Sequence, residues 1–250
     1  MKRSPASAVP GAERRQAIAV VSPHAGYVYS GPVAGEVFST TAMPPVFVVL
    51  GPAHREIGPL FAVQAKGSWE TPPRRDTGRR GPGGPDPRRL PARRSRTNGP
   101  TRSSIPSRSS CRSSSTSDRT PAIVPVCVSA EAGFAELETL GRALAAAIKE
   151  DGRGTLIVAS TDMSHYVDRK TAEAKDMQAI RKVLDLDPRG LFDTVVRERI
   201  SMCGFQPTAA ALVAAIALGA TGAELVRYRT SGDATGDYDQ VVGYAGLRIH

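Results

Sequence analysis

The stretch LIVASTDMSH, residues 156–165, is a short apolar run that ends in polar side chains and a histidine. Two other stretches have the same form, VVSPHAGY at residues 20–27 and VVLGPAH at residues 48–54. Short β-branched runs of this kind are typical of buried strands. In open α/β sheets, ligands bind beyond the carboxyl ends of the strands. We therefore expect His24, His54 and His165 to lie at one edge of a sheet, where together they suggest a metal site.

The rest of the chain alternates between similar runs and alanine-rich helical patterns, which predicts an α/β fold. Strands are expected at residues 18–22, 46–50, 60–65, 122–128, 155–159, 224–230 and 241–249. Helices are expected at residues 30–39, 134–149, 171–184, 190–198 and 208–217. The last of these is almost entirely alanine and aliphatic residues, so we expect it to be packed on both sides.

Residues 73–121 interrupt this alternation. They contain thirteen arginines, ten serines and no aromatic residue, and no apolar period of either kind. Such a segment cannot bury enough surface to offset the entropy of ordering it, so we predict disorder. Residues 1–16 are also expected to be a disordered tail. The predicted organisation is a single α/β domain made of residues 17–72 and 122–250.

The positive charge of the chain comes from this segment. The formal net charge is +9, with 33 Lys and Arg against 24 Asp and Glu. Residues 73–121 hold 13 Arg and 3 Asp, a net charge of +10, which leaves 20 basic against 21 acidic residues elsewhere. The folded part is therefore nearly neutral, and we expect no specific nucleic-acid surface on it. An arginine-serine insert that binds RNA electrostatically is the competing interpretation of the segment.

The cysteines and the apolar runs bear on location. Cys111, Cys127 and Cys203 form neither a CxxC pair nor an even disulfide framework, which favours a reducing compartment. No apolar run approaches the roughly 20 residues of a membrane span. Residues 1–16 lack the apolar stretch of a secretory signal. We expect a cytoplasmic protein that is not bound to a membrane.

Cys203 is a further candidate ligand, because it lies just ahead of the alanine-rich helix. Two histidines and a cysteine with open positions suit iron, copper or zinc, since imidazole and thiolate are ligands of borderline and soft metals. Each residue also has a simpler interpretation. A lone histidine after a strand is more often structural, and a lone cysteine is more often buried and inert.

Asp162 and His165 are three residues apart and would share a face if a helix followed the strand. Asp162 would then be a carboxylate that orients a metal ligand, and His165 would be an acid/base group beside the metal. The alternative for Asp162 is an N-cap carboxylate.

These motifs resemble the Memo family, known in bacteria and archaea as AmmeMemoRadiSam system protein B. The resemblance is carried by PHAGYVYSG at 23–31, LGPAH at 50–54, STDMSH at 160–165, Cys203-Gly204 and the ending GYAGLRIH at 243–250. It covers residues 18–69 and 122–250.

The resemblance implies a three-layer α/β fold with helices on both faces of the sheet, related to the LigB-type (class III) extradiol dioxygenases. By motif, the metal ligands fall on His24, His54 and Cys203, and Asp162 and His165 line the same pocket. Fe(II) is the expected metal, with Cu or Zn as alternatives. The family also implies association with AMMECR-type and radical SAM proteins.

Three functions follow as expectations. The first is a Memo-like, redox-active metal protein acting on a small molecule. The second is a LigB-like extradiol dioxygenase on a small aromatic substrate, although a thiolate in place of a carboxylate means that the activity cannot be inherited from the fold. The third is a non-catalytic binding module.

The resemblance also bears on residues 73–121. This chain keeps the family's WETP at 69–72 and IVPV at 123–126, but lacks the D-E-x-A-H-x-x-E-H-S-x-E-V-Q-L-P-F-L-Q stretch between them. Codons for DERAHEVEHSIEVQLPFLQYLRPDA, read in a shifted frame, spell residues 96–121, and codons for LGEIPVDA, read with another offset, spell residues 74–80. We therefore predict out-of-frame translation here. The family's additional His-bearing segment is also missing from residues 1–16, and we expect an impaired copy that folds poorly.

Overall fold

The computed structural model describes residues 14–55, 58–64 and 121–250, which all belong to one compact unit of the chain. The segment 73–120 and most of the predicted tail, residues 1–13, lie outside the described residues. Within the tail, Arg15 is described. It forms a bridge with Thr41 and an ion pair of 3.0 Å with Glu224.

Within the described residues, eight strands form one mixed sheet. At its centre, β4 (Ala122–Val128), β2 (Val46–Pro52), β5 (Thr155–Ser160) and β1 (Ala19–Ser22) run parallel in that order. The strand β3 (Phe61–Val63) adds antiparallel to β4. On the other side, β8 (Val241–Ile249) pairs antiparallel with β1, and also with β6 (His165–Val167) and β7 (Ala223–Thr230).

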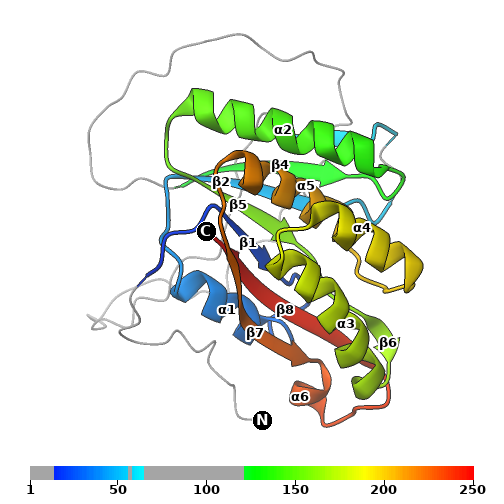
Figure 1. Ribbon diagram of the computed structural model, residues 1–250. Helices are drawn as coiled ribbons and strands as arrows, with labels where there is room; N and C mark the ends of the chain where they lie inside the picture. The colour runs from blue at the N-terminus through cyan, green and yellow to red at the C-terminus, as the bar shows by residue number, and fades with distance from the viewer. Residues whose placement is uncertain (1–13, 56–57, 65–120) are drawn as a thin grey trace, which may run out of the picture. The chain divides into compact units, whose positions relative to one another are not determined.

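Helices cover both faces, so the expected three-layer α/β architecture is confirmed (Figure 1). On one face, α5 (Phe205–Ala217) lies on the parallel strands, and α2 (Phe134–Asp151) and α4 (Pro188–Arg197) pack against α5. On the same face α3 (Arg169–Leu184) packs on β7 and β8. On the other face α1 (Gly31–Ser39) packs on β1, β7 and β8. The short α6 (Gly232–Thr235) follows β7.

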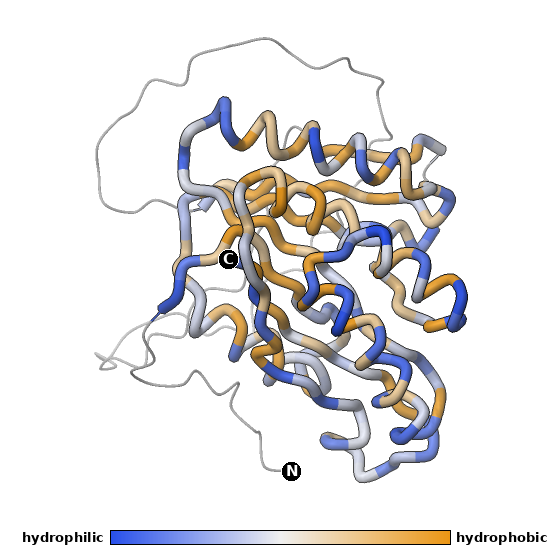
Figure 2. The backbone as a smooth tube through the Cα atoms, in the orientation of Figure 1, coloured by the Kyte–Doolittle hydropathy of each residue, from blue (hydrophilic) through white to orange (hydrophobic). Residues whose placement is uncertain are grey.

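The alternation of side chains along the strands divides the core between these faces. Val21 and Ile157 belong to the large cluster under α5, whereas Val20 and Leu156 face Val37 of α1. Figure 2 shows the apolar residues concentrated in α5 and the central strands. Residues 206–215 of α5 are all buried, which confirms the expected packing on both sides of this helix.

The predicted elements are all present, with boundaries that differ by up to three residues. Two elements were not predicted, β6 and α6, which have three and four residues. The helices α3 and α4 begin two residues earlier than expected, since Asp168 and Asp187 act as their N-caps. No helix in the described residues has the length and apolar character needed to cross a membrane.

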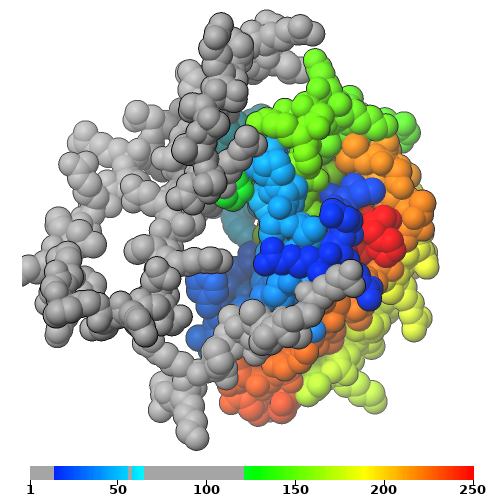
Figure 3. Space-filling view, turned by 90° about the vertical axis from the view of Figure 1, so that its left-hand side faces the viewer, coloured from blue at the N-terminus to red at the C-terminus, as the bar shows by residue number. Residues whose placement is uncertain are grey.

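One part of the sheet carries apolar side chains that are only partly covered. On the α1 side of β2 and β4, Phe47, Val49, Pro125 and Cys127 are half-buried and Ile123 is 42% exposed. The helix described on this side, α1, packs on β1, β7 and β8 instead. Figure 3 shows residues from the N-terminal part of the chain, in blue and light blue, at the surface between α2 in green and β7 in orange. We call Phe47, Val49, Ile123, Pro125 and Cys127 the bare sheet face.

Candidate metal centre

Three loops meet at the carboxyl edge of the parallel strands. His24 follows β1, His54 follows β2 and Asp162 follows β5. Because β5 lies between β2 and β1 in the sheet, these three loops are neighbours. Cys203 reaches the same edge from the residues that lead into α5.

Three donor atoms converge at this edge. His24 Nε2 lies 3.5 Å from Cys203 Sγ and 3.8 Å from Asp162 Oδ2. The donor atoms of His24, Asp162 and Cys203 are all within 4.8 Å of one another. In a tetrahedral site with metal–ligand distances of about 2.0–2.3 Å, two ligand atoms are separated by roughly 3.3–3.8 Å. The separations of His24 Nε2 from Cys203 Sγ and from Asp162 Oδ2 match this spacing, so the donor set fits a metal ion.

Hydrogen bonds fix the carboxylate of Asp162. Its Oδ1 accepts from the backbone N–H of His24 at 2.9 Å and of Ala25 at 3.3 Å. This arrangement leaves Oδ2 facing His24 Nε2. No helix follows β5, because Thr161–Ser164 is irregular and His165 begins β6. Asp162 is therefore neither on a shared helical face with His165 nor an N-cap.

The imidazole of His24 is oriented from its other side. Its Nδ1 forms a hydrogen bond of 2.9 Å with Ser160 Oγ, so Nε2 faces Cys203 and Asp162. Burial lowers the pKa of His24, and the nearby His54 and His165 act in the same direction, whereas Asp162 opposes them. A lowered pKa favours the neutral imidazole, which is the form that ligates metals.

Burial raises the pKa of the Cys203 thiol, and the Asp162 carboxylate contributes to the same shift. The sulfur accepts a hydrogen bond from the N–H of Asp162 at 3.3 Å. A thiol with a raised pKa is a poor free nucleophile. Metal binding would instead deprotonate it and release a proton.

Gly204 brings Cys203 close to the end of β5. Its N–H donates to Thr161 Oγ1 at 2.8 Å. A Cβ at this position would lie 2.6 Å from the carbonyl oxygen of Ser160 and 2.6 Å from Thr161 Cβ. Only glycine permits this approach without a shift of the backbone.

The other two predicted histidines lie beside the donor group. The ring of His54 meets the ring of His24 edge-on, with centroids 5.6 Å apart. His165 Nδ1 hydrogen-bonds the carbonyl of Ser201 at 2.8 Å, and His165 interacts electrostatically with His24. The structure thus brings all five predicted site residues together. Asp162, which was expected beside the metal ligands, lies within the donor group itself.

A family model described as Memo-like protein matches residues 1–73 and 114–248. The chain belongs to the Memo family. A MEMO1 family protein of Methanopyrus kandleri is 36% identical over 242 residues, which cover 91% of this chain and 81% of the relative. One of Methanothermobacter thermautotrophicus is 35% identical over 242 residues, with coverages of 91% and 83%. One of Thermotoga petrophila is 35% identical over 239 residues, with coverages of 91% and 80%.

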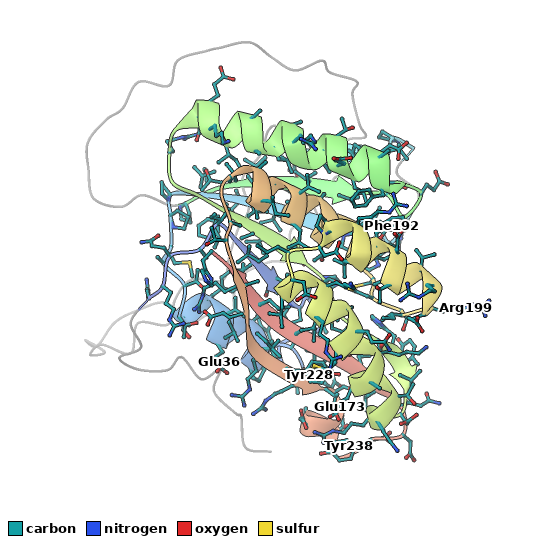
Figure 4. The ribbon with its side chains drawn as sticks, in the orientation of Figure 1. Glu36, Glu173, Phe192, Arg199, Tyr228 and Tyr238 are labelled. Atoms are coloured by element: carbon teal, nitrogen blue, oxygen red, sulfur yellow. The ribbon has the colours of Figure 1, made fainter. Side chains whose placement is uncertain are left out.

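Asp176 supports the site of this Memo-family protein and was not predicted from the sequence. It is fully buried in α3 and accepts hydrogen bonds from the N–H of Ser164 at 2.9 Å and from the hydroxyl of Tyr228 at 2.7 Å. Tyr228 lies on β7 and is labelled in Figure 4. Asp176 thereby holds the loop that carries Asp162. The sequence did contain a signal, because Asp176 is a carboxylate at a position of the helical pattern that is otherwise apolar. The buried residues of α3 are Ala172, Asp176, Ala179, Ile180 and Val183.

Asp176 makes the stability of the Memo-family fold depend on pH. Burial raises the pKa of its carboxyl, against the opposing effect of its hydrogen bonds. The folded state therefore keeps this proton to a higher pH than the unfolded state, whose pKa is about 3.9. The contribution of Asp176 to the free energy of unfolding falls as the pH rises between these two pKa values and is constant above them.

Asp176→Asn is expected to remove this dependence while its amide oxygen still accepts from Ser164. Between the unfolded-state and folded-state pKa values of Asp176, the free energy of unfolding of the unsubstituted protein falls with pH, whereas this contribution is absent from the variant. The free energy of unfolding of the variant minus that of the unsubstituted protein should therefore rise with pH. Urea unfolding at a series of pH values from 4 to 7 measures it. The exposed Asp239→Asn is the control. A constant difference between D176N and the unsubstituted protein would contradict the prediction.

Proposed function

We propose that this protein binds one redox-active metal ion and acts as a metal-dependent oxidoreductase on a small molecule. Fe(II) is the proposed metal, and Cu is the redox-active alternative. Zn, the other alternative, would supply Lewis acidity without redox chemistry. The observation that carries the proposal is the convergence of the His24, Asp162 and Cys203 donor atoms within 4.8 Å. By family resemblance, His54 would complete the ligand set.

The protein groups have distinct tasks in this proposal. The bound metal would supply Lewis acidity and an electron-transfer centre. His24 provides a neutral donor, and Asp162 and the Cys203 thiolate offset the charge of the cation. His165 Nδ1 is held by the Ser201 carbonyl at 2.8 Å, so its Nε2 is the nitrogen that can accept or donate a proton.

Metal analysis of the full chain tests this proposal. After anaerobic purification we expect about one iron per chain, with copper or zinc taken up when iron is removed. Cys203→Ser should lower the affinity for the metal by at least about tenfold, because a hydroxyl is a far weaker ligand than a thiolate. Cys127→Ser is the matched control, since Cys127 lies on β4, outside the donor group. A protein that binds none of the three metals stoichiometrically would contradict the proposal.

An extradiol dioxygenase is the second candidate. It is favoured by the two imidazoles, His24 and His54, beside the carboxylate of Asp162, because two histidines and a carboxylate bind iron in non-haem oxygenases. Oxygen consumption that depends on catechol would support this activity. A non-catalytic binding module, in contrast, would keep its function after replacement of His24, His54 and Cys203 by alanine.

We also propose that residues 73–121 are an out-of-frame version of a family segment and that this copy is impaired. Two observations support the proposal. The family model leaves residues 74–113 unmatched, and the bare sheet face has no described helix packed over β4 on that side. Sequencing the gene tests it. An open reading frame whose codons cannot encode the E-H-S-x-E-V-Q-L-P-F-L-Q motif in any frame would contradict it.

A further inference from the structure

A cavity of about 500 Å³ lies beside the candidate metal centre. Its lining consists of residues 53–55 and Gly58, from the segment after β2, and of residues 129–131, from the segment after β4. His54 belongs to this lining, and its ring meets the ring of His24 with centroids 5.6 Å apart. A ligand in the cavity would therefore lie next to the metal donors.

The register of β2 and β4 brings the two walls of the cavity together. Pro52 and Val128 are paired at the ends of these parallel strands, so both segments leave the same edge of the sheet as neighbours. Arg55 and Glu131 each lie three residues beyond that pair and belong to the lining. One wall thus carries a guanidinium group, and the other carries a carboxylate.

Hydrogen bonds fix the wall that carries the carboxylate. Ser129 Oγ accepts from the backbone N–H of Glu131 at 3.2 Å. The buried side chain of Gln206 donates through Nε2 to the carbonyl of Ala130 at 2.9 Å. Gln206 lies in the first turn of α5, the helix that Cys203 leads into. The wall and the thiol of the donor group are therefore held by the same part of the fold.

The two charged side chains in the lining are available to a ligand. Arg55 and Glu131 are exposed, and within the described residues neither side chain forms an ion pair or a hydrogen bond. A guanidinium group binds a carboxylate through two parallel hydrogen bonds, and a carboxylate binds an ammonium group. Two opposite charges that are not paired with each other are complementary to a ligand that carries the reverse pair.

We propose that this cavity binds a small zwitterion, a molecule that has one carboxylate and one ammonium group. Its carboxylate would bind Arg55, and its ammonium group would bind Glu131. A volume of about 500 Å³ is in the usual range for small-molecule sites and has room for a ligand of amino-acid size. The zwitterion is the substrate class of the metal centre, and this catalytic role rests on the proposed function, whereas binding in the cavity does not.

NMR titration of the full chain, at low ionic strength and in the presence of EDTA, tests the proposal. The probes are 4-aminobutyrate, butyrate and n-butylamine, which share a four-carbon chain and differ in their charged groups. We expect 4-aminobutyrate to bind at least about fivefold more tightly than either of the others, because only this compound engages both walls.

Arg55→Gln and Glu131→Gln each remove one charge at nearly constant size. Both should weaken binding of 4-aminobutyrate at least about fivefold. R55Q should lower the affinity for butyrate and not that for n-butylamine, and E131Q should do the reverse. Arg181→Gln and Glu150→Gln are the matched controls at exposed positions of α3 and α2, and they should bind 4-aminobutyrate as the unsubstituted protein does.

A charge exchange separates this pairing from a general effect of charge on the protein. The double variant Arg55→Glu with Glu131→Arg keeps both charges, so it should bind 4-aminobutyrate within about threefold of the unsubstituted protein. Equal affinity for the three probes would overturn the inference, as would equal binding of 4-aminobutyrate by R55Q and R181Q. A loss in R55Q without a loss in E131Q would also overturn it, because the cavity would then select an anion. Failure to bind metal would count against the proposed function alone, since these titrations are made without metal.

Discussion

Replacing His24 with alanine is expected to abolish stoichiometric metal binding. His24 Nε2 faces both of the other donors, at 3.5 Å from Cys203 Sγ and 3.8 Å from Asp162 Oδ2. Loss of this ligand leaves the Asp162 carboxylate, the neighbouring His54 and a Cys203 thiol whose pKa is already raised by burial. We expect the affinity to fall at least about a hundredfold, since imidazole is a principal ligand for these metals. Equilibrium dialysis with Fe(II) under anaerobic conditions, followed by metal analysis, measures the effect.

His250→Ala provides the matched control. His250 is the last residue of the chain and contacts Gly222, at the opposite end of β8 from Val241. Its replacement should leave metal content unchanged. If H24A retains one metal per chain while H250A does too, the ion binds elsewhere and the proposed centre is wrong.

Gly204→Ala is expected to damage both the fold and the site. The added Cβ would lie 2.6 Å from the carbonyl oxygen of Ser160, which is backbone and cannot move away alone. Overpacking of this kind typically costs about 1–3 kcal/mol of unfolding free energy. In a protein of this size, each kcal/mol lowers the Tm by about 2–4 °C. Since Gly204 directly follows Cys203, the displacement should also weaken metal binding. Thermal unfolding and metal analysis of the same sample measure both effects.

Gly51→Ala is the control for this substitution. Gly51 also lies near the carboxyl end of a parallel strand, but a Cβ there meets no atom of the described residues within 4 Å. We expect its Tm and metal content to match those of the unsubstituted protein. Equal stability of G204A and G51A would mean that the approach of Cys203 to β5 does not require glycine.

The strands were predictable because a buried strand appears in the sequence as a run of consecutive apolar residues. Val46–Leu50 and Ala122–Val128 are apolar runs, and His24 and His54 each follow the end of a strand after one residue. The carboxyl edge could therefore be anticipated from local sequence alone. The strand β6 could not, because it has three residues and depends on pairing with β8, which is about 75 residues further along the chain.

The finer geometry of the site depends on contacts between distant segments. Asp162 faces His24 because its other oxygen accepts two backbone N–H groups from the loop after β1. Asp176 of α3 accepts a hydrogen bond from Ser164. The sequence pattern predicts the helix but not this partner. These bonds join residues whose proximity is set by the strand order, which no local pattern contains. The strand pattern indicated the candidate residues and the family resemblance assigned their roles, whereas their hydrogen-bond partners are visible only in the structure.

The position of β8 in the sheet has a consequence for biosynthesis. This strand holds β1, β6 and β7 together, and it consists of residues 241–249 of a 250-residue chain. Its pairing with β1 joins Ala19 to Ile249. Because β1 pairs with a strand from the opposite end of the domain, this side of the sheet cannot close until β8 has been made. Contacts of such long sequence separation slow folding and prolong the exposure of apolar strands. We therefore expect a nascent chain of this protein to depend on chaperones until β8 has paired with β1.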